Sequence, residues 1–85
     1  MGDTANKAQK FLLDNNCGDL ILNDVRDKKA DDRIYASDIM MKFLESERKT
    51  IELLDFTNGL QTLKLPPNGY YFLYIVSRSV FINQL

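Results

Sequence analysis

Charged side chains are distributed very unevenly along the chain. Residues 1–50 hold 19 of the 23 charged residues, nine basic and ten acidic, whereas residues 51–85 hold only Glu52, Asp55, Lys64 and Arg78. Six of the nine aromatic residues lie in this sparsely charged second part. Mixed charges favour contact with water, whereas a long apolar stretch must be covered by other parts of the fold. The pattern therefore predicts solvated helices first, followed by a sheet whose faces are mostly covered.

The length of the chain allows one hydrophobic core. Compact domains usually have about 50 to 250 residues, so we expect the 85 residues to form a single domain, 1–85. Hydrophobic residues make up 45% and charged residues 27% of the sequence, which is typical of a folded globular chain rather than a disordered one. The net charge of -1 gives no overall attraction to phosphate backbones or to anionic lipid.

Two segments have the apolar spacing of amphipathic helices. The first covers about residues 4–16, where apolar residues recur three to four positions apart. The second covers about residues 37–48, where Ser37 is a good N-cap and Asp38 lies near the positive end of the helix dipole. One stripe on this second helix is apolar: Ala36, Ile39, Met40, Phe43 and Leu44.

Residues 51–84 have the features of β structure. Asn58-Gly59 follows an apolar segment and favours a two-residue hairpin turn. Residues 70–76 are seven apolar residues in succession, which is typical of a central strand covered on both faces. The predicted fold is therefore α+β, with the two helices packed on a small antiparallel sheet built mainly from residues 51–84.

Two shorter segments, residues 20–22 and 33–35, leave open whether each is a strand or a turn of helix. Periodicity cannot separate a strand from one helical turn at this length. We favour a strand for the first and an edge strand beside it for the second.

The sequence contains few candidate catalytic or metal-binding residues. Histidine is absent and Cys17 is the only cysteine, which excludes most nucleophile and base pairs, any intramolecular disulfide and the usual zinc ligand sets. The paired carboxylates Asp31 and Asp32 lie among Lys and Arg without apolar neighbours to raise a pKa, so we interpret them as solvated surface. We expect no enzyme, no catalytic residue, no metal site and no cofactor.

The N-terminal segment is polar, without the apolar region of a signal peptide, and no apolar run is long enough to span a membrane. We therefore expect a cytoplasmic protein without a membrane partner.

The apolar second part favours a role in protein–protein interaction. A domain of this size buries only about 60% of its unfolded surface, so one face or edge of the expected sheet would remain apolar and exposed. We expect an adaptor, inhibitor or regulator that binds an unidentified protein partner and self-associates as a homodimer. The expected interaction surface consists of Tyr70, Tyr71, Phe72, Tyr74, Val80 and Phe81.

The alternative is a small DNA-binding regulator of the winged helix-turn-helix type. Its nucleic-acid contacts would be Arg26, Lys28, Lys29 and Arg33, and its wing would lie near Asn58. Acidic residues interleave with these cations along the chain, which leaves the cluster almost no net field. We therefore rank a nucleic-acid partner below a protein partner.

Overall fold

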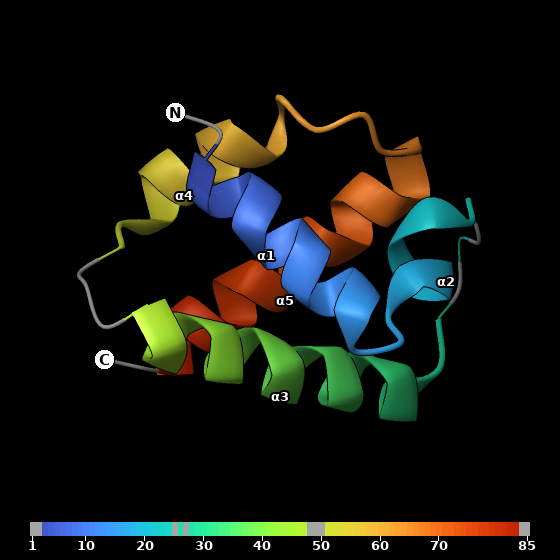
Figure 1. Cartoon of the computed structure of the whole chain (residues 1–85). Helices are drawn as coiled ribbons and strands as arrows, with labels where there is room; N and C mark the ends of the chain where they lie inside the picture. The colour runs from blue at the N-terminus through green and yellow to red at the C-terminus, as the bar shows by residue number, and fades with distance from the viewer. Residues whose placement is uncertain (1–2, 25, 27, 48–50, 84–85) are drawn as a thin grey trace.

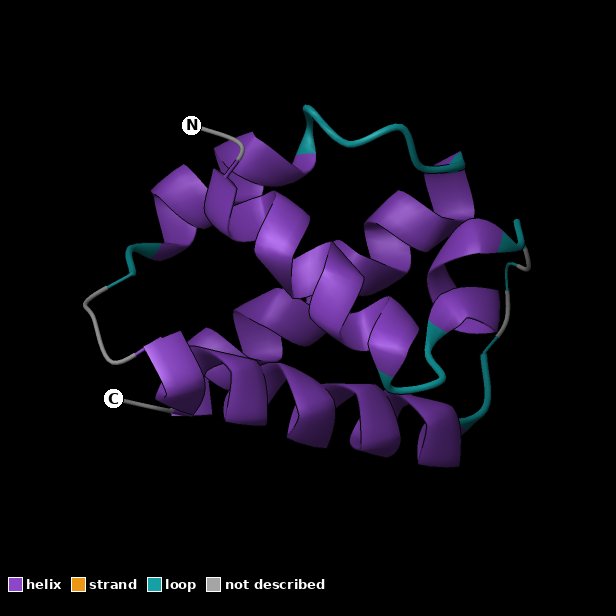
Figure 2. Cartoon of the chain, in the orientation of Figure 1, coloured by secondary structure: helices purple, strands orange, loops and turns teal. Residues whose placement is uncertain are grey.

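The chain forms a bundle of helices in a computed structural model that describes residues 3–24, 26, 28–47 and 51–83 (Figure 1). The helices are α1 (Asp3–Asp14), α2 (Gly18–Leu22), α3 (Ala30–Glu47), α4 (Leu53–Leu60) and α5 (Pro67–Asn83). The described residues contain no strand (Figure 2).

The prediction of an α+β fold with an antiparallel sheet over residues 51–84 is therefore wrong. The residues expected to form the sheet form α4 and α5 instead. The expected limits at residues 48 and 84 lie outside the described residues.

The apolar run 70–76 belongs to a helix whose two sides have different environments. Phe72, Leu73, Val76 and Val80 are buried at a spacing of three to four residues, whereas Tyr71 lies on the opposite, exposed side. Seven consecutive apolar residues fit a doubly covered strand and a largely buried helix equally well, because neither pattern leaves a polar face to reveal the period. Packing against neighbouring helices decided between them, and it overrode the β propensity of the aromatic residues.

The Asn58-Gly59 dipeptide, expected to form a hairpin turn, lies inside a helix. Asn58 and Gly59 belong to α4, and no glycine among the described residues has a positive φ. Pro67 is the first residue of α5, where its missing N–H is no loss, because the first N–H groups of a helix have no partner within it. The amide of Tyr70 donates to the carbonyl of Pro66 at 2.8 Å, which closes the first turn of α5.

The helix expected over about residues 4–16 is confirmed as α1, which ends slightly earlier. Asn16 adopts a φ of 68°, in the left-handed region that Asn tolerates better than most residues. The amide of Cys17 donates to the carbonyl of Leu12 at 2.9 Å, and the amide of Asn16 donates to Leu13 at 3.3 Å. This is the hydrogen-bond pattern of a Schellman motif, and the burial of Cys17 and Leu12 supplies its apolar contact.

The helix expected over about residues 37–48 is part of a longer helix, because α3 begins at Ala30. Ser37 is therefore an interior residue and not an N-cap, and the edge strand expected at 33–35 does not form. The first turns of α3 carry Ile34 and Tyr35 with 61% and 43% of their surface exposed. Since these turns add no residue to the core, they leave no apolar stripe by which the sequence would reveal them.

The strand expected at residues 20–22 is also wrong, since these residues form most of the short helix α2. Ile21 is fully buried, and α2 packs against both α1 and α5.

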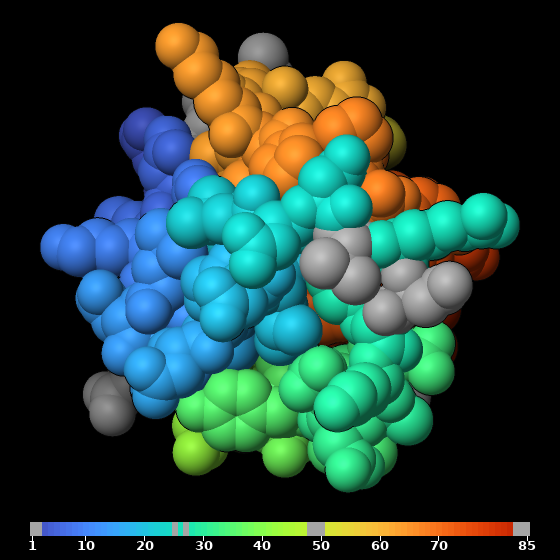
Figure 3. All heavy atoms as spheres, turned by 90° about the vertical axis from the view of Figure 1, so that its right-hand side faces the viewer, coloured from blue at the N-terminus to red at the C-terminus, as the bar shows by residue number. Residues whose placement is uncertain are grey.

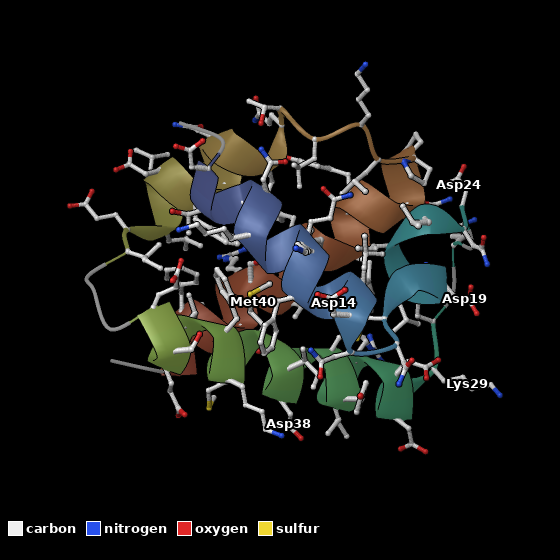
Figure 4. All side chains as sticks on the ribbon, viewed as in Figure 1. Asp14, Asp19, Asp24, Lys29, Asp38 and Met40 are labelled. Atoms are coloured by element: carbon white, nitrogen blue, oxygen red, sulfur yellow. The ribbon has the colours of Figure 1, made fainter. Side chains whose placement is uncertain are left out.

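One core lies between the helices. α3 and α4 each pack against both α1 and α5, and Met40 points inward from α3 (Figure 4). The buried apolar residues come from all five helices and the turn after α1: Ala5, Ala8, Leu12, Cys17, Ile21, Ala36, Ile39, Met40, Phe43, Leu44, Phe56, Leu60, Phe72, Leu73, Val76 and Val80.

Gly69 allows α2 to contact the beginning of α5. A Cβ atom at this buried position would overlap the carbonyl oxygen of Ile21 and lie 2.8 Å from its carbonyl carbon. These obstructing atoms are backbone, so a change of side-chain rotamer cannot relieve the overlap. A residue larger than glycine would force α2 and α5 apart.

We predict that Gly69→Ala destabilises the fold by roughly 2 to 4 kcal/mol, because α2 must move to make room. The matched control is Gly18→Ala, whose Cβ would lie 3.4 Å from Leu13 Cδ2, close to ordinary contact. We expect that variant to stay within about 1 kcal/mol of the wild type. Urea unfolding followed by circular dichroism measures both, and equal stabilities would contradict the close packing at Gly69.

Candidate functional site

The segment between α2 and α3 is attached to the beginning of α5. The backbone amide of Asn68 donates to Asp24 Oδ1 at 2.8 Å, and Asn68 Nδ2 donates to the Asp24 carbonyl at 3.4 Å. Asp24 lies close to the start of α5 in Figure 4. Its carboxylate therefore caps α5, although 44 residues separate the two in sequence.

Two cations on this segment and one on α3 lie beside α5. Lys28 is half-buried, with its Nζ atom 5.3 Å from the centre of the Phe72 ring, within the range of a cation–π interaction. Arg33 is presented by the first turns of α3, where its amide donates to the carbonyl of Lys29 at 3.2 Å. Arg26 is exposed.

These cations surround a small hollow of about 90 Å³ at one end of the molecule. Figure 3 shows this end, where α2 and the segment after it lie between the start of α5 and the start of α3. We call the hollow the basic pocket, and its described lining consists of Arg26, Lys28, Arg33, Asn68, Tyr71, Phe72 and Ile75.

The tertiary structure separates charges that alternate in the sequence. Asp24, Asp31 and Asp32 lie close to the three cations along the chain, but no carboxylate belongs to the described lining of the basic pocket. The Asp24 carboxylate is turned to the Asn68 amide. Among the described residues, the lining of this hollow is therefore basic.

The structure brings together residues from both predicted sites. Tyr71 and Phe72, expected in a protein interface, share the basic pocket with Arg26, Lys28 and Arg33, expected to contact nucleic acid. Lys29 is outside this lining and points away from the molecule (Figure 4).

The other expected interface residues lie elsewhere on α5. Tyr70 and Tyr74 are half-buried, and their rings stack with centroids 6.4 Å apart. Phe81 packs against Phe56, with the centroids of their rings 5.6 Å apart, and Val80 is buried in the core.

The predicted function on an aromatic β-sheet surface is wrong, because the described residues form no sheet. The aromatic residues are distributed around a helix and so do not form one flat face. The expected homodimer rested on that sheet and has no support in the described helices. The alternative also loses its wing, since Asn58 lies within α4.

Sequence reasoning missed Asn68 and Ile75 as residues of the pocket. Both lie within one turn of Tyr71 or Phe72 on α5, so a helical interpretation of residues 67–83 would have placed them on the same side.

Cys17 lies in the core and is poorly suited to chemistry. Its side chain is fully buried, and its Sγ atom is 3.7 Å from the carbonyl oxygen of Asn15. Burial raises the pKa of the Cys17 thiol, and the nearby Asp32 carboxylate raises it further. A reactive cysteine needs the opposite environment, one that favours the thiolate.

The described residues contain no cluster of three or more His, Cys, Asp or Glu side chains that could hold a metal ion. None of the helices described is both long and apolar enough to cross a membrane. No protein-family model, curated protein or solved structure matches the chain.

We predict that Asp24→Ala destabilises the protein by about 1 kcal/mol, because the N-terminal amide of α5 loses its cap. Asp38→Ala is the control, since Asp38 is exposed on α3, and its expected effect is within about 0.5 kcal/mol. Urea unfolding measures both changes. Equal effects would show that the Asp24 contact contributes nothing to stability.

We predict that the wild type loses stability relative to Cys17→Ala as the pH rises above about 8.5, the ordinary pKa of a thiol. Above this pH the unfolded chain releases the thiol proton, whereas the native state retains it because its thiol pKa is raised. Below this pH both states are protonated and the full stabilisation is present. Urea unfolding of both proteins at pH 7, 8.5 and 10 measures the difference, and a difference independent of pH would contradict the prediction.

Proposed function

We propose that this chain is a binding protein that holds an anionic ligand in the basic pocket. The observation that carries the proposal is the meeting of Arg26, Lys28 and Arg33 with the exposed ring of Tyr71 at one hollow. This surface replaces the aromatic sheet as the candidate site of function.

The charge of the pocket supports an anionic ligand. Three cations line about 90 Å³ of space, and its described lining contains no carboxylate, although the whole chain has a net charge of -1. Arg26 and Arg33 line the same hollow, so a bound anion can interact favourably with both. The two guanidinium groups can each donate paired hydrogen bonds to a phosphate or carboxylate.

The rest of the lining supports a ligand that also has a flat or apolar part. Tyr71 is 64% exposed, so its ring can stack on a planar group. Ile75 adds an aliphatic surface one turn further along α5. The pocket thus offers a charged side and an apolar side to one small ligand or to one part of a larger partner.

The chemistry of the lining supports binding rather than catalysis. Its described side chains include no Asp, Glu or Cys, and the sequence contains no His. His, Asp and Glu are the commonest general bases, so the described lining lacks the groups most often used for proton transfer. The single cysteine is buried in the core.

Phenyl phosphate tests the proposal because it combines a dianion with one ring. We predict millimolar binding that shifts the amide signals of residues 68–75 in ¹⁵N-correlated spectra, as is reasonable for a ligand of this size at roughly 0.3 kcal/mol per heavy atom. Arg33→Gln should weaken this binding about tenfold, the loss expected from one charge-assisted contact of about 1.5 kcal/mol.

Three comparisons make the phenyl phosphate result specific. Lys42→Gln removes the same charge from an exposed position of α3 outside the pocket and should leave binding unchanged. Phenol and inorganic phosphate should each bind more weakly than the combined probe. Absence of saturable shifts, or equal weakening by Arg33→Gln and Lys42→Gln, would refute the proposed function.

A further inference from the structure

The exposed side of α5 continues the basic pocket as an apolar ridge. Tyr71, Ile75 and Ile82 are 64%, 36% and 53% exposed, and Arg78 lies between the two isoleucines. Their spacing of three to four residues places all four on one side of the helix. From Tyr71 to Ile82 the ridge is about 16 Å long at ~1.5 Å per residue.

Three hollows follow one another along this ridge, and each shares a lining residue with the next. The basic pocket shares Ile75 with a second hollow of about 320 Å³, whose described lining also contains Arg78, Ser79 and Ile82. The second hollow shares Ile82 with a third of about 310 Å³, which Ile51, Glu52, Leu53 and Phe81 also line. An extended ligand could therefore occupy them in sequence.

Building on the proposed function, we infer that the ligand is an acidic amphipathic segment of another protein that lies along α5. Its carboxylates would occupy the basic pocket and approach Arg78, and its apolar side chains would cover Ile75 and Ile82. The sequence of α5 contains no Asp or Glu, so no carboxylate of this helix would repel such a partner.

Charge complementarity favours this partner over a second copy of the chain. Even without Lys28, the described linings of the three hollows contain three cations, Arg26, Arg33 and Arg78, against the single carboxylate of Glu52. Pairing of two such faces would bring together two surfaces with the same excess of positive charge, and like charges across an interface oppose association. A negatively charged partner neutralises the excess.

The apolar part of the ridge favours a protein over a nucleic acid. Binding of a single strand uses a series of aromatic rings on which successive bases stack, together with cations that follow the backbone. This ridge has one well-exposed ring, Tyr71, and continues with isoleucine side chains towards Glu52. Aliphatic side chains of a partner match that surface better than bases do.

Selection from a displayed library of random 16-residue peptides against the full chain tests the inference. We expect enrichment of peptides that combine a cluster of Asp or Glu with several apolar residues. Fluorescence anisotropy of the enriched peptides should then show binding that weakens with added salt. Replacing their acidic residues by the corresponding amides should reduce affinity at least tenfold.

Variants on the ridge provide the decisive comparison. Ile82→Ser should weaken the enriched peptides about tenfold, because it removes an apolar contact at the far end of the ridge. Leu54→Ser is the matched control, since Leu54 is 69% exposed on α4 and outside all three described linings. That variant should bind the peptides as the wild type does, and both variants should bind phenyl phosphate normally.

Several results would overturn the inference. These are enriched peptides without an acidic excess, equal binding to Ile82→Ser and Leu54→Ser, no enrichment, or stronger binding of oligo(dT) than of any peptide. A dimer in sedimentation that Ile82→Ser abolishes would also overturn it. If Arg33-dependent binding of phenyl phosphate persists in these cases, only the inference fails, whereas its loss means that the proposed function fails too.

Discussion

The close approach of Gly69 to the carbonyl group of Ile21 fixes how α2 packs on α5, next to the basic pocket. It brings the short helix α2 against the beginning of α5 with no room for a side chain. The segment that leaves α2 then passes the start of α5, where the Asp24 carboxylate caps the Asn68 amide at 2.8 Å. Arg26 and Lys28 follow directly in this segment. The packing at Gly69 and the Asp24 cap thus bring the segment that carries Arg26 and Lys28 to the beginning of α5.

The helix α5 serves the core and the surface at the same time. One side carries Phe72, Leu73, Val76 and Val80 into the core, and the other presents an exposed ridge beginning at Tyr71. Phe72 connects the two roles, since its ring is buried while Lys28 Nζ lies 5.3 Å from its centre. Because the buried side holds α5 rigidly, the exposed side can present its residues in fixed positions, which reduces the entropic cost of binding a ligand.

The described charges around the pocket lie in a different arrangement in space from their order along the chain. Along the chain, cations and carboxylates alternate over residues 24–33, and their sum is small. In the fold, Asp24 faces an amide of α5, while Arg26 and Arg33 line the same hollow. Electrostatic interactions fall off with distance and with screening by water, so the few groups nearest to a hollow dominate its field.

The order of the residues alone was enough to predict where charge and apolar character lie, and with them the helix α1 and the core-facing part of α3; it also shows that the chain has no histidine. It did not determine the secondary structure of residues 51–83, because a short apolar run without a polar face has no visible period. The apolar pattern also did not predict the first turns of α3, because Ile34 and Tyr35 face solvent there and form no apolar stripe. That Tyr71 and Arg33 share a pocket follows from the packing of α3 against α5, two segments far apart in the chain, and no local pattern could predict it.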